Sequence, residues 1–245
     1  MAGREEMLKR VREALGRSQL APPRSIEFPP LGQVMPPIDP ENLVPKFEAE
    51  LQNVDGRPHR ASNRVELEEF FRLILKGSPS LVLSRSALIS RLGLENTFRA
   101  WGLKVAVWPS VGASEAAIRD FRECSFEAEF GVTGVDFVLA ETGSLILSSS
   151  TEGSQLASLA PPVHIALYRR SQVLASLEGV LEQARMQPGR STVFITGPSR
   201  TGDIEQILIR GVHGPRDVHA ILIEEACLEG SSTGDWQAAD SKDRT

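Results

Sequence analysis

Short apolar runs alternate with longer stretches of helical spacing through the first half of the chain. The runs LVLS at 81–84 and KVAVW at 104–108 predict buried strands, because they are brief and rich in valine and leucine. The stretches around them predict helices at 46–54, at 64–76, up to Trp101 and at 114–124. Strands that alternate with helices favour an α/β fold in which a parallel sheet is covered on both faces.

Polar residues predict where two of these helices begin. Asn63 stands just before the stretch at 64–76, and Glu66 follows three residues later, as in a capping box. Ser110 or Ser114 can cap the next helix.

After Cys124 the chain becomes rich in strand-like runs that glycines interrupt. Strands are predicted within FGVTGVDFVLAETGSLIL (130–147), at 162–168 and at 191–197, and a helix at 177–186. The segments ILIR (207–210) and HAILIE (219–224) flank a turn rich in glycine and proline, which predicts a hairpin.

The N-terminal segment differs from the rest. Residues 5–15 predict a short amphipathic helix, whose apolar stripe is Met7, Leu8, Val11 and Leu15. Half of the 16 prolines lie between Pro22 and Pro45, a composition that favours an extended tether. The helix either packs on its own domain or docks on a partner. The predicted parts are a helix with a Pro-rich linker, an α/β domain and a polar, disordered tail, at 1–42, 43–228 and 229–245.

The composition is that of a globular domain, with 41% hydrophobic and 24% charged residues in 245. The formal net charge of -5 gives no electrostatic reason to expect nucleic-acid binding. No run approaches the roughly 18 apolar residues of a membrane span, and the charged N-terminus lacks the apolar stretch of a secretory signal. We therefore expect a cytoplasmic protein that does not enter a membrane.

Familiar cofactor and nucleophile motifs are missing. The two cysteines, Cys124 and Cys227, form no C-x-x-C, so the chain is not expected to hold an iron–sulfur cluster or a cysteine zinc site. The four histidines form no H-E-x-x-H. Walker A, G-x-G-x-x-G and G-x-S-x-G patterns are also missing, so the cofactor stays unknown.

Polar segments follow the apolar strands of the second half. FITGPSRTGD runs from a strand into a loop, as expected for a ligand crevice outside the carboxyl ends of strands. In this loop Ser199, Arg200 and Thr201 offer hydroxyls and a guanidinium to an anion, and Asp203 can cap a helix. The Gly-Pro and Thr-Gly pairs can equally be turn chemistry alone.

Glu141 stands between two apolar runs, beside Gly143, which permits a tight turn or a close ligand approach. It is a candidate general base, nucleophile or ligand anchor, or else a strand-end carboxylate paired with Arg200. His213 lies in the Gly-flanked GVHGP turn and is either catalytic, a ligand contact or structural. His164 lies within a strand and favours a satisfied core position.

These segments in this order resemble the LUD-domain family: GVTGVDFVLAETGSLIL, LAPPVHIAL and FITGPSRTGDIEQILIRGVHGPRDVHAILIE. The resemblance covers 131–224 most closely. It implies a Rossmann-like three-layer α/β/α domain of the NagB/RpiA/CoA-transferase type. Carried over position by position, it implies catalytic roles for Glu141 and His213. The implied ligand-binding positions are Thr133, Asp136, Thr142, Gly143, Gly197, Ser199, Arg200, Thr201, Asp203 and Gly214, with Pro198 between them.

The resemblance further implies lactate utilization, the oxidation of L-lactate to pyruvate, with iron–sulfur partner proteins in an oxidoreductase complex. This chain would contribute a site for a small carboxylate, held by Arg200 with Glu141 or His213 handling a proton. Two alternatives stay open. One is a non-catalytic assembly or regulatory subunit that docks its partners through the N-terminal extension. The other is an independent transferase or isomerase acting on a CoA ester or phosphosugar, with Glu141 as nucleophile.

Overall fold

The computed structural model describes residues 3–17, 37–110, 112–186, 191–202, 208–211 and 213–229. The chain divides into two compact units, Met1–Pro37 and Ile38–Thr245. In the first unit, helix α1 (Arg4–Arg17) exposes the predicted apolar residues Met7, Leu8 and Val11. Most of the Pro-rich stretch and the tail from 230 lie outside the described residues.

The second unit is built on a parallel sheet of six strands in the order β1-β12-β7-β4-β2-β3. They are β1 (Arg57–Ala61), β2 (Ser80–Leu83), β3 (Lys104–Val107), β4 (Phe130–Gly134), β7 (Val163–Tyr168) and β12 (Asp217–Ile223). The prediction of an α/β fold with a parallel sheet is confirmed. The runs at β2, β3 and β7 were recognisable because strands buried on both faces are short and continuously apolar.

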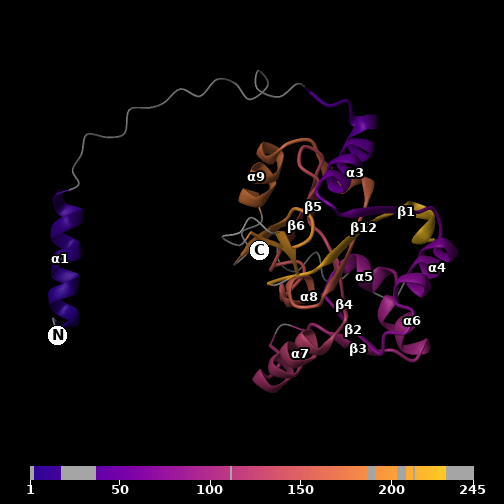
Figure 1. The fold of residues 1–245 in the computed structure, drawn as a ribbon, viewed down its shortest axis with the longest axis horizontal. Coiled ribbons are helices and arrows are strands. Elements are labelled where there is room, and N and C mark those ends of the chain that lie inside the picture. Colours follow the sequence, from indigo (N-terminus) through magenta and orange to yellow (C-terminus); the bar gives the residue numbers. More distant parts are fainter. Residues whose placement is uncertain are drawn as a thin grey trace, which may run out of the picture. The chain divides into compact units, whose positions relative to one another are not determined.

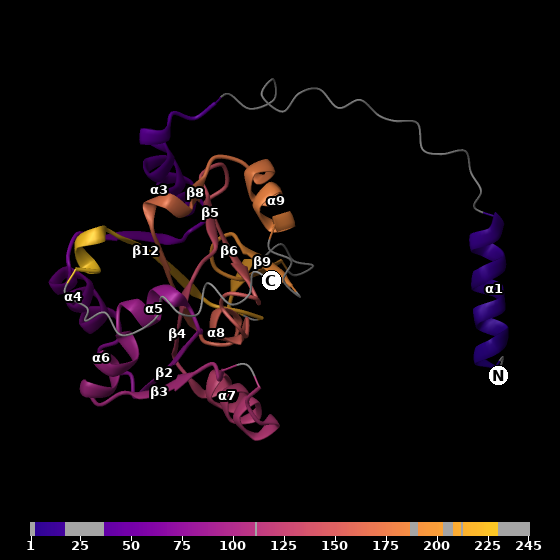
Figure 2. The same cartoon turned by 180° about the vertical axis from the view of Figure 1, so that it is seen from behind.

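One face of this sheet carries helices α4 (Arg64–Ile74), α5 (Ala87–Arg91) and α6 (Leu94–Ala100). Their side chains Leu67, Phe71, Ile89, Leu94 and Phe98 pack on the strands and are almost fully buried. The other face is shared. Helix α7 (Glu115–Glu127) covers β2 and β3, and α8 (Leu156–Leu159) lies on β4. Helix α3 (Leu43–Asn53) and a second sheet cover β7 and β12. Figure 1 and Figure 2 show these layers from opposite sides.

The second sheet has four strands in the order β8-β5-β6-β9. They are β5 (Phe137–Leu139), β6 (Ser144–Ser148), β8 (Val173–Leu174) and β9 (Thr192–Ile195). Helix α9 (Leu177–Met186) packs Val180 against Leu139 and Ile146 of this sheet. The expected α/β/α layering is therefore incomplete, because a sheet replaces helices over part of one face. The shorter 3-10 helices are η1 (Pro40–Asn42), η2 (Arg170–Gln172) and η3 (Glu225–Cys227).

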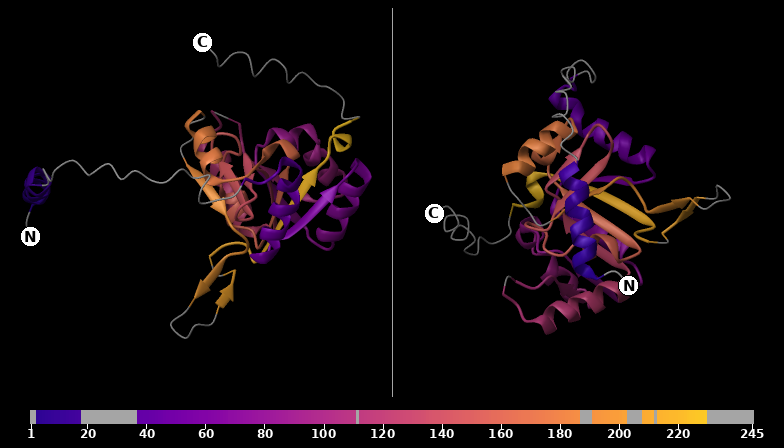
Figure 3. Two further views of the ribbon diagram at one scale, coloured as in Figure 1. Left: turned by 90° about the horizontal axis from the view of Figure 1, so that it is seen from above. Right: turned by 90° about the vertical axis from the view of Figure 1, so that its left-hand side faces the viewer.

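The predicted hairpin of 207–210 with 219–224 is wrong. Instead, β11 (Leu208–Arg210) pairs antiparallel with β10 (Arg200–Gly202), and the two project from the domain as a separate arm (Figure 3). Strand β12 lies inside the parallel sheet, between β1 and β7. Its residues from Val218 to Ile223 are all buried, as two covered faces require.

The two predicted helix caps are formed. The side chain of Asn63 accepts from Glu66 N at 3.0 Å, so Asn63 caps α4 as predicted. Glu66 Oε2 accepts from Ser62 N at 2.8 Å, one residue before the cap, so the second bond of the expected capping box is displaced by one residue. Ser114, rather than Ser110, caps α7 by accepting from Ala117 N.

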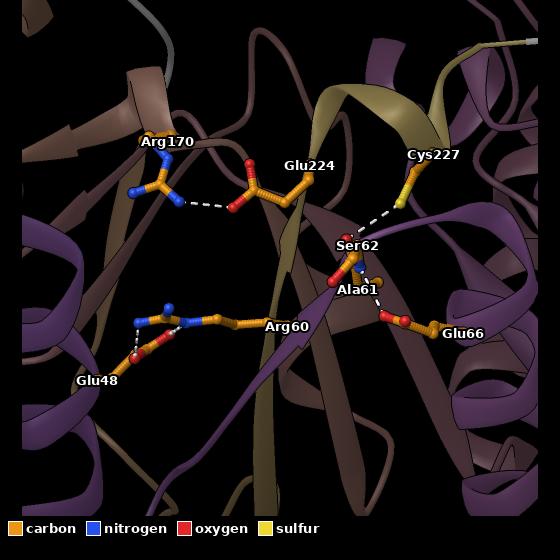
Figure 4. A network of polar contacts seen from close by, with 8 residues as sticks. All are labelled: Glu48, Arg60, Ala61, Ser62, Glu66, Arg170, Glu224 and Cys227. Atoms are coloured by element: carbon orange, nitrogen blue, oxygen red, sulfur yellow. Dashed lines mark hydrogen bonds and ion pairs between the residues drawn. The ribbon is translucent and has the colours of Figure 1, made fainter.

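Polar contacts tie together the carboxyl ends of β1, β7 and β12 (Figure 4). Arg170 pairs with Glu224 at 2.6 Å, and Arg60 with Glu48 at 2.7 Å. The thiol of Cys227 donates to Ala61 O at 3.1 Å, which fixes the last described turn on β1. Cys124 and Cys227 are both free thiols, and of the two only Cys227 is buried. None of the described helices has the length and apolar character needed to cross a bilayer.

Candidate functional site

The order in which successive strands of the chain are added to the parallel sheet changes direction between β2 and β4. From β2 the chain moves outward to β3, and then β4, β7 and β12 follow on the other side of β2. Ligands of open α/β sheets bind outside the carboxyl ends of the strands at such a switch point. In this protein that place lies just after Leu83 and Gly134.

A buried glutamate occupies the switch point. Glu152 is only 3% exposed, and it comes from the segment that follows β6. Its Oε2 accepts from Ser84 Oγ at 2.5 Å and from Gly134 N at 2.9 Å. Its backbone carbonyl accepts from Arg85 N at 3.1 Å. Glu152 therefore fastens the loop after β6 to the ends of both β2 and β4.

The environment of this carboxyl favours its neutral form. Burial raises the pKa of Glu152 to about 7, and the nearby charge of Asp136 adds to the rise. Burial also raises the pKa of Asp136, although Asp136 accepts from Thr151 Oγ1 at 2.8 Å and from Ser148 N at 2.5 Å. Perturbed carboxyls of this kind are common at functional sites.

A cavity of about 720 Å³ opens beside this loop, over the ends of β2 and β3 and the start of α7. Trp108 and Gln155 form part of its wall. Its other polar lining residues are Arg85, Ser110, Ser149, Ser150, Ser154 and Ser191. Among the described residues that line the cavity, none carries a carboxylate. The cavity can therefore accept an anion, which Arg85 and the serine hydroxyls would bind.

The AETGS turn lies elsewhere, against the C-terminal end of α3. A Cβ on Gly143, whose φ is +67°, would lie 2.3 Å from Leu51 N. Thr142 and Ser144 share a hydrogen bond of 2.6 Å, and Ser144 continues to Thr196 at 2.7 Å. The side chain of Glu141 forms no hydrogen bond or ion pair with another described residue. The turn thus joins β5 and β6 to α3 and to the end of β9.

The TGPSR loop, residues 196–200, packs on the same end of α3. Gly197 has a φ of +77°, and a Cβ there would lie 2.2 Å from Val54 O. Arg200 forms an ion pair with Asp55, so the Glu141–Arg200 pair that the sequence left open is not formed. The expectation that this loop follows a strand of the parallel sheet is wrong, because β9 pairs antiparallel with β6.

The GVHGP turn completes this group of loops. Ser199 N donates to Pro215 O at 2.8 Å, and Gly211 N donates to Ser199 O at 2.9 Å. Gly214 lies close enough to Ser199 that a Cβ would be 3.1 Å from its side chain. His213 is exposed and makes no side-chain hydrogen bond with a described residue. This turn leads into the amino end of β12, so it and the TGPSR loop lie at the opposite edge of the sheet from the switch point.

The remaining predicted site residues do not lie together in one place. Thr133 is buried within β4, where its Oγ1 hydrogen-bonds with His164 Nε2 at 2.8 Å. Thr201 belongs to β10, and Asp203 lies outside the described residues. Asp136 lies near the switch point, where its charge interacts with Glu152. Within the described part of the chain, no group of three or more His, Cys, Asp or Glu is placed to hold a metal ion.

Two further histidines meet under α4. His59 Nε2 and His219 Nδ1 are 3.0 Å apart, and both rings contact Phe70. Burial, together with the neighbouring His59, lowers the pKa of His219 to about 4. Burial also lowers the pKa of His59. Each ring is therefore neutral in the folded protein at pH 7.

This pair predicts an acid-sensitive fold. An unfolded histidine has a pKa of about 6.5, so below that pH the unfolded state binds more protons than the folded state, and stability falls as the pH drops toward 4. Between pH 7 and pH 4, the free energy of unfolding should fall less for His219→Gln than for the parent protein, because glutamine takes up no proton. We expect the difference to be on the order of 2 kcal/mol. Urea unfolding across this range measures it. Parallel profiles for the variant and the parent protein would contradict it.

Sequence reasoning missed Arg85, Trp108 and Glu152. A usable signal existed for the first two, because Arg85 directly follows the predicted strand at 81–84 and Trp108 is the last residue of the predicted strand at 104–108. Glu152 had no such signal, since its segment, SSSTEGS, reads as an ordinary polar loop. Only the pairing of β2 with β4 brings Ser84 and Gly134 to its carboxyl group.

Comparisons with known proteins agree with this architecture. Lactate utilization protein C of an Exiguobacterium species is 27% identical, over 92% of this chain and 97% of that protein. The uncharacterized protein YkgG of Escherichia coli is also 27% identical, over 92% of this chain and 100% of YkgG. A crystal structure of a DUF162 family protein from Deinococcus radiodurans has a TM-score of 0.52 at 20% identity, over 76% of this chain and 99% of that one. That likeness supports the fold alone.

The model of the LUD domain family matches residues 44–223, nearly all of the compact second unit. The family that the motifs indicated is thereby confirmed, and this chain belongs to the LUD domain family.

Proposed function

We propose that this chain is a subunit of a cytoplasmic lactate-utilization system and that it contributes the site for a small carboxylate. Membership of the LUD domain family and the relatives named lactate utilization protein C support this role. The observation that carries the site assignment is the cavity at the switch point, where the described lining residues include Arg85 and five serines and none of them carries a carboxylate. We also assign the Rossmann-like fold to the NagB/RpiA/CoA-transferase type.

Iron–sulfur partner proteins would take up the electrons. Oxidation of lactate to pyruvate releases two electrons and two protons, and such steps rely on a redox group. A cluster needs about four cysteine thiolates, whereas this chain has two cysteines. We therefore place the electron-transfer centres on partners within an oxidoreductase complex of carbon metabolism.

Arg85 suits a carboxylate better than Arg200 does. Arg200 is already paired with Asp55, so a ligand there would have to displace that carboxylate. Arg85 lines the cavity and makes no ion pair with a described residue. A guanidinium forms two parallel hydrogen bonds with a carboxylate, which fixes the orientation of a 2-hydroxy or 2-oxo acid.

Thermal unfolding with added ligand tests this assignment. We expect L-lactate and pyruvate to raise the melting temperature by several degrees, because a ligand at 100 times its Kd adds about 2.7 kcal/mol. Arg85→Gln should abolish the rise, and Arg91→Gln, which removes an exposed charge on α5 instead, should retain it. Sodium chloride at equal ionic strength controls for salt.

Variants in the motif loops test the alternative position of the carboxylate site in the same experiment. Glu141 and His213 remain proposed contacts for a ligand or partner, at a distance from the cavity. If Glu141→Gln or Arg200→Gln abolishes the lactate effect while Arg85→Gln does not, the carboxylate site lies at the motif loops. In that case the assignment to the cavity is wrong.

A further inference from the structure

The cavity is larger than a three-carbon acid needs. Its volume of about 720 Å³ falls within the range of roughly 300–1,000 Å³ that is typical of sites for drug-sized ligands and cofactors. A lactate molecule bound at Arg85 would leave most of this space to solvent. The size therefore points to a larger ligand, and the lining residues indicate its chemistry.

Two serine hydroxyls in the wall are held with their hydrogens available. Ser149 Oγ accepts from Ser191 N at 3.2 Å, and Ser154 Oγ accepts from Leu156 N at 3.2 Å. Each bond fixes the oxygen and leaves the O–H group to donate. Neither hydroxyl donates to an acceptor among the described residues. Both can therefore donate to the oxygens of an anion in the cavity.

The start of α7 lies at the same wall. Gly112 and Ala113 precede this helix of 13 residues, Ile118 lies one turn inside it, and all three line the cavity. Ala113 N already donates to Ser110 O, and Ala117 N donates to Ser114 Oγ, so this end of the helix contributes the favourable field of its dipole rather than a set of free donors. Among the described lining residues, Arg85 carries the full positive charge.

The remaining wall is aromatic and apolar. Trp108 lies on the cavity with its ring edge-to-face against Phe121, at 5.2 Å between centroids. Ile118 continues this surface. An organic group of moderate size can pack there while an anionic end reaches Arg85 and the serines.

From this arrangement we propose that the cavity binds a phosphorylated organic molecule of about nucleotide size. Its phosphate contacts Arg85 and the hydroxyls of Ser149 and Ser154, and its organic part packs on Trp108. A phosphate offers more acceptor oxygens than a carboxylate, and the number of donors in this wall matches it. The inference depends on the cavity alone and not on the lactate role.

Titration of the full chain with inorganic pyrophosphate, ADP and adenosine tests the proposal, by calorimetry and by tryptophan fluorescence. We expect ADP to bind at least 10-fold more tightly than adenosine, because adenosine lacks the phosphates. Pyrophosphate should compete with ADP. Arg85→Gln should weaken ADP binding at least 10-fold, Ser154→Ala should weaken it several-fold, and Arg91→Gln should leave it unchanged.

Three results would overturn the proposal: no binding of ADP or pyrophosphate at millimolar concentration, equal binding of ADP and adenosine, or an ADP affinity unaffected by Arg85→Gln. The thermal-unfolding experiment with lactate distinguishes failure of the carboxylate assignment from failure of this proposal. Binding of ADP without any effect of lactate would remove the carboxylate assignment only. A lactate effect without binding of phosphorylated probes would remove this inference only.

Discussion

Replacing Glu152 with alanine should destabilise the domain by about 2–3 kcal/mol at pH 7. The substitution leaves the Ser84 hydroxyl and Gly134 N–H buried without their shared acceptor, and buried groups that lose a partner cost about 1–3 kcal/mol each. Removal of a carboxyl that is costly to bury offsets part of this loss. Urea unfolding of both proteins measures the difference.

Glu152→Gln should behave differently, because glutamine keeps an acceptor oxygen and resembles the neutral acid. The folded-state pKa of about 7 lies above the ordinary value of 4.5, so the contribution of Glu152 to stability is fully present below pH 4.5 and is lost as the pH rises through 7. The glutamine variant should match the parent protein at pH 5 and exceed its stability by about 2 kcal/mol at pH 8. If it instead loses as much as the alanine variant at both pH values, the ionised carboxylate is essential and this account is wrong.

Gly143→Ala should cost at least about 2 kcal/mol more than Gly77→Ala. Both glycines have a positive φ, +67° and +83°, so each alanine carries a similar backbone penalty of about 1 kcal/mol. A Cβ at position 143 would also collide with the backbone of α3, 2.3 Å from Leu51 N, whereas nothing lies within 4 Å at position 77. The pair of variants therefore isolates the cost of close packing.

Unfolding in urea compares the two variants. Equal losses would show that the AETGS turn can move away from α3, and close packing would then not explain its glycine. A larger loss for Gly143→Ala would show that this motif joins β5, β6 and α3, whatever role Glu141 has beside it. The comparison leaves Glu141 itself unchanged.

Local patterns predicted most of the elements because helices and buried strands carry their own periodicity. The helix at 177–186 has the predicted bounds, and β2, β3 and β7 lie within one or two residues of their predicted ranges. The cap at Asn63 was also predictable, because a helix cap involves neighbouring residues only. The pairing of the strand that contains HAILIE could not be predicted in this way, because it depends on segments that are distant in the sequence.

The candidate site shows the same division. The motif residues Glu141, Gly143 and Arg200 were visible in the sequence, and the structure places their two loops against the end of α3. The GVHGP turn is hydrogen-bonded to the second of these loops. The cavity was invisible, although Arg85 follows a strand that was correctly predicted. Its position at a switch point depends on β4 lying beside β2, which only the assembled sheet defines.

By itself, the sequence determined the alternation of helices and strands, the family and the positions of its motifs, because these depend on local spacing and residue order. Only the tertiary structure decided that Glu152 meets Ser84 from 68 residues away and that Arg200 pairs with Asp55 across 145 residues. The pKa and partners of a charged side chain depend on which distant segments exclude water from it. That is why the carboxyl at the switch point was an ordinary loop residue in the sequence and is a buried acid in the fold.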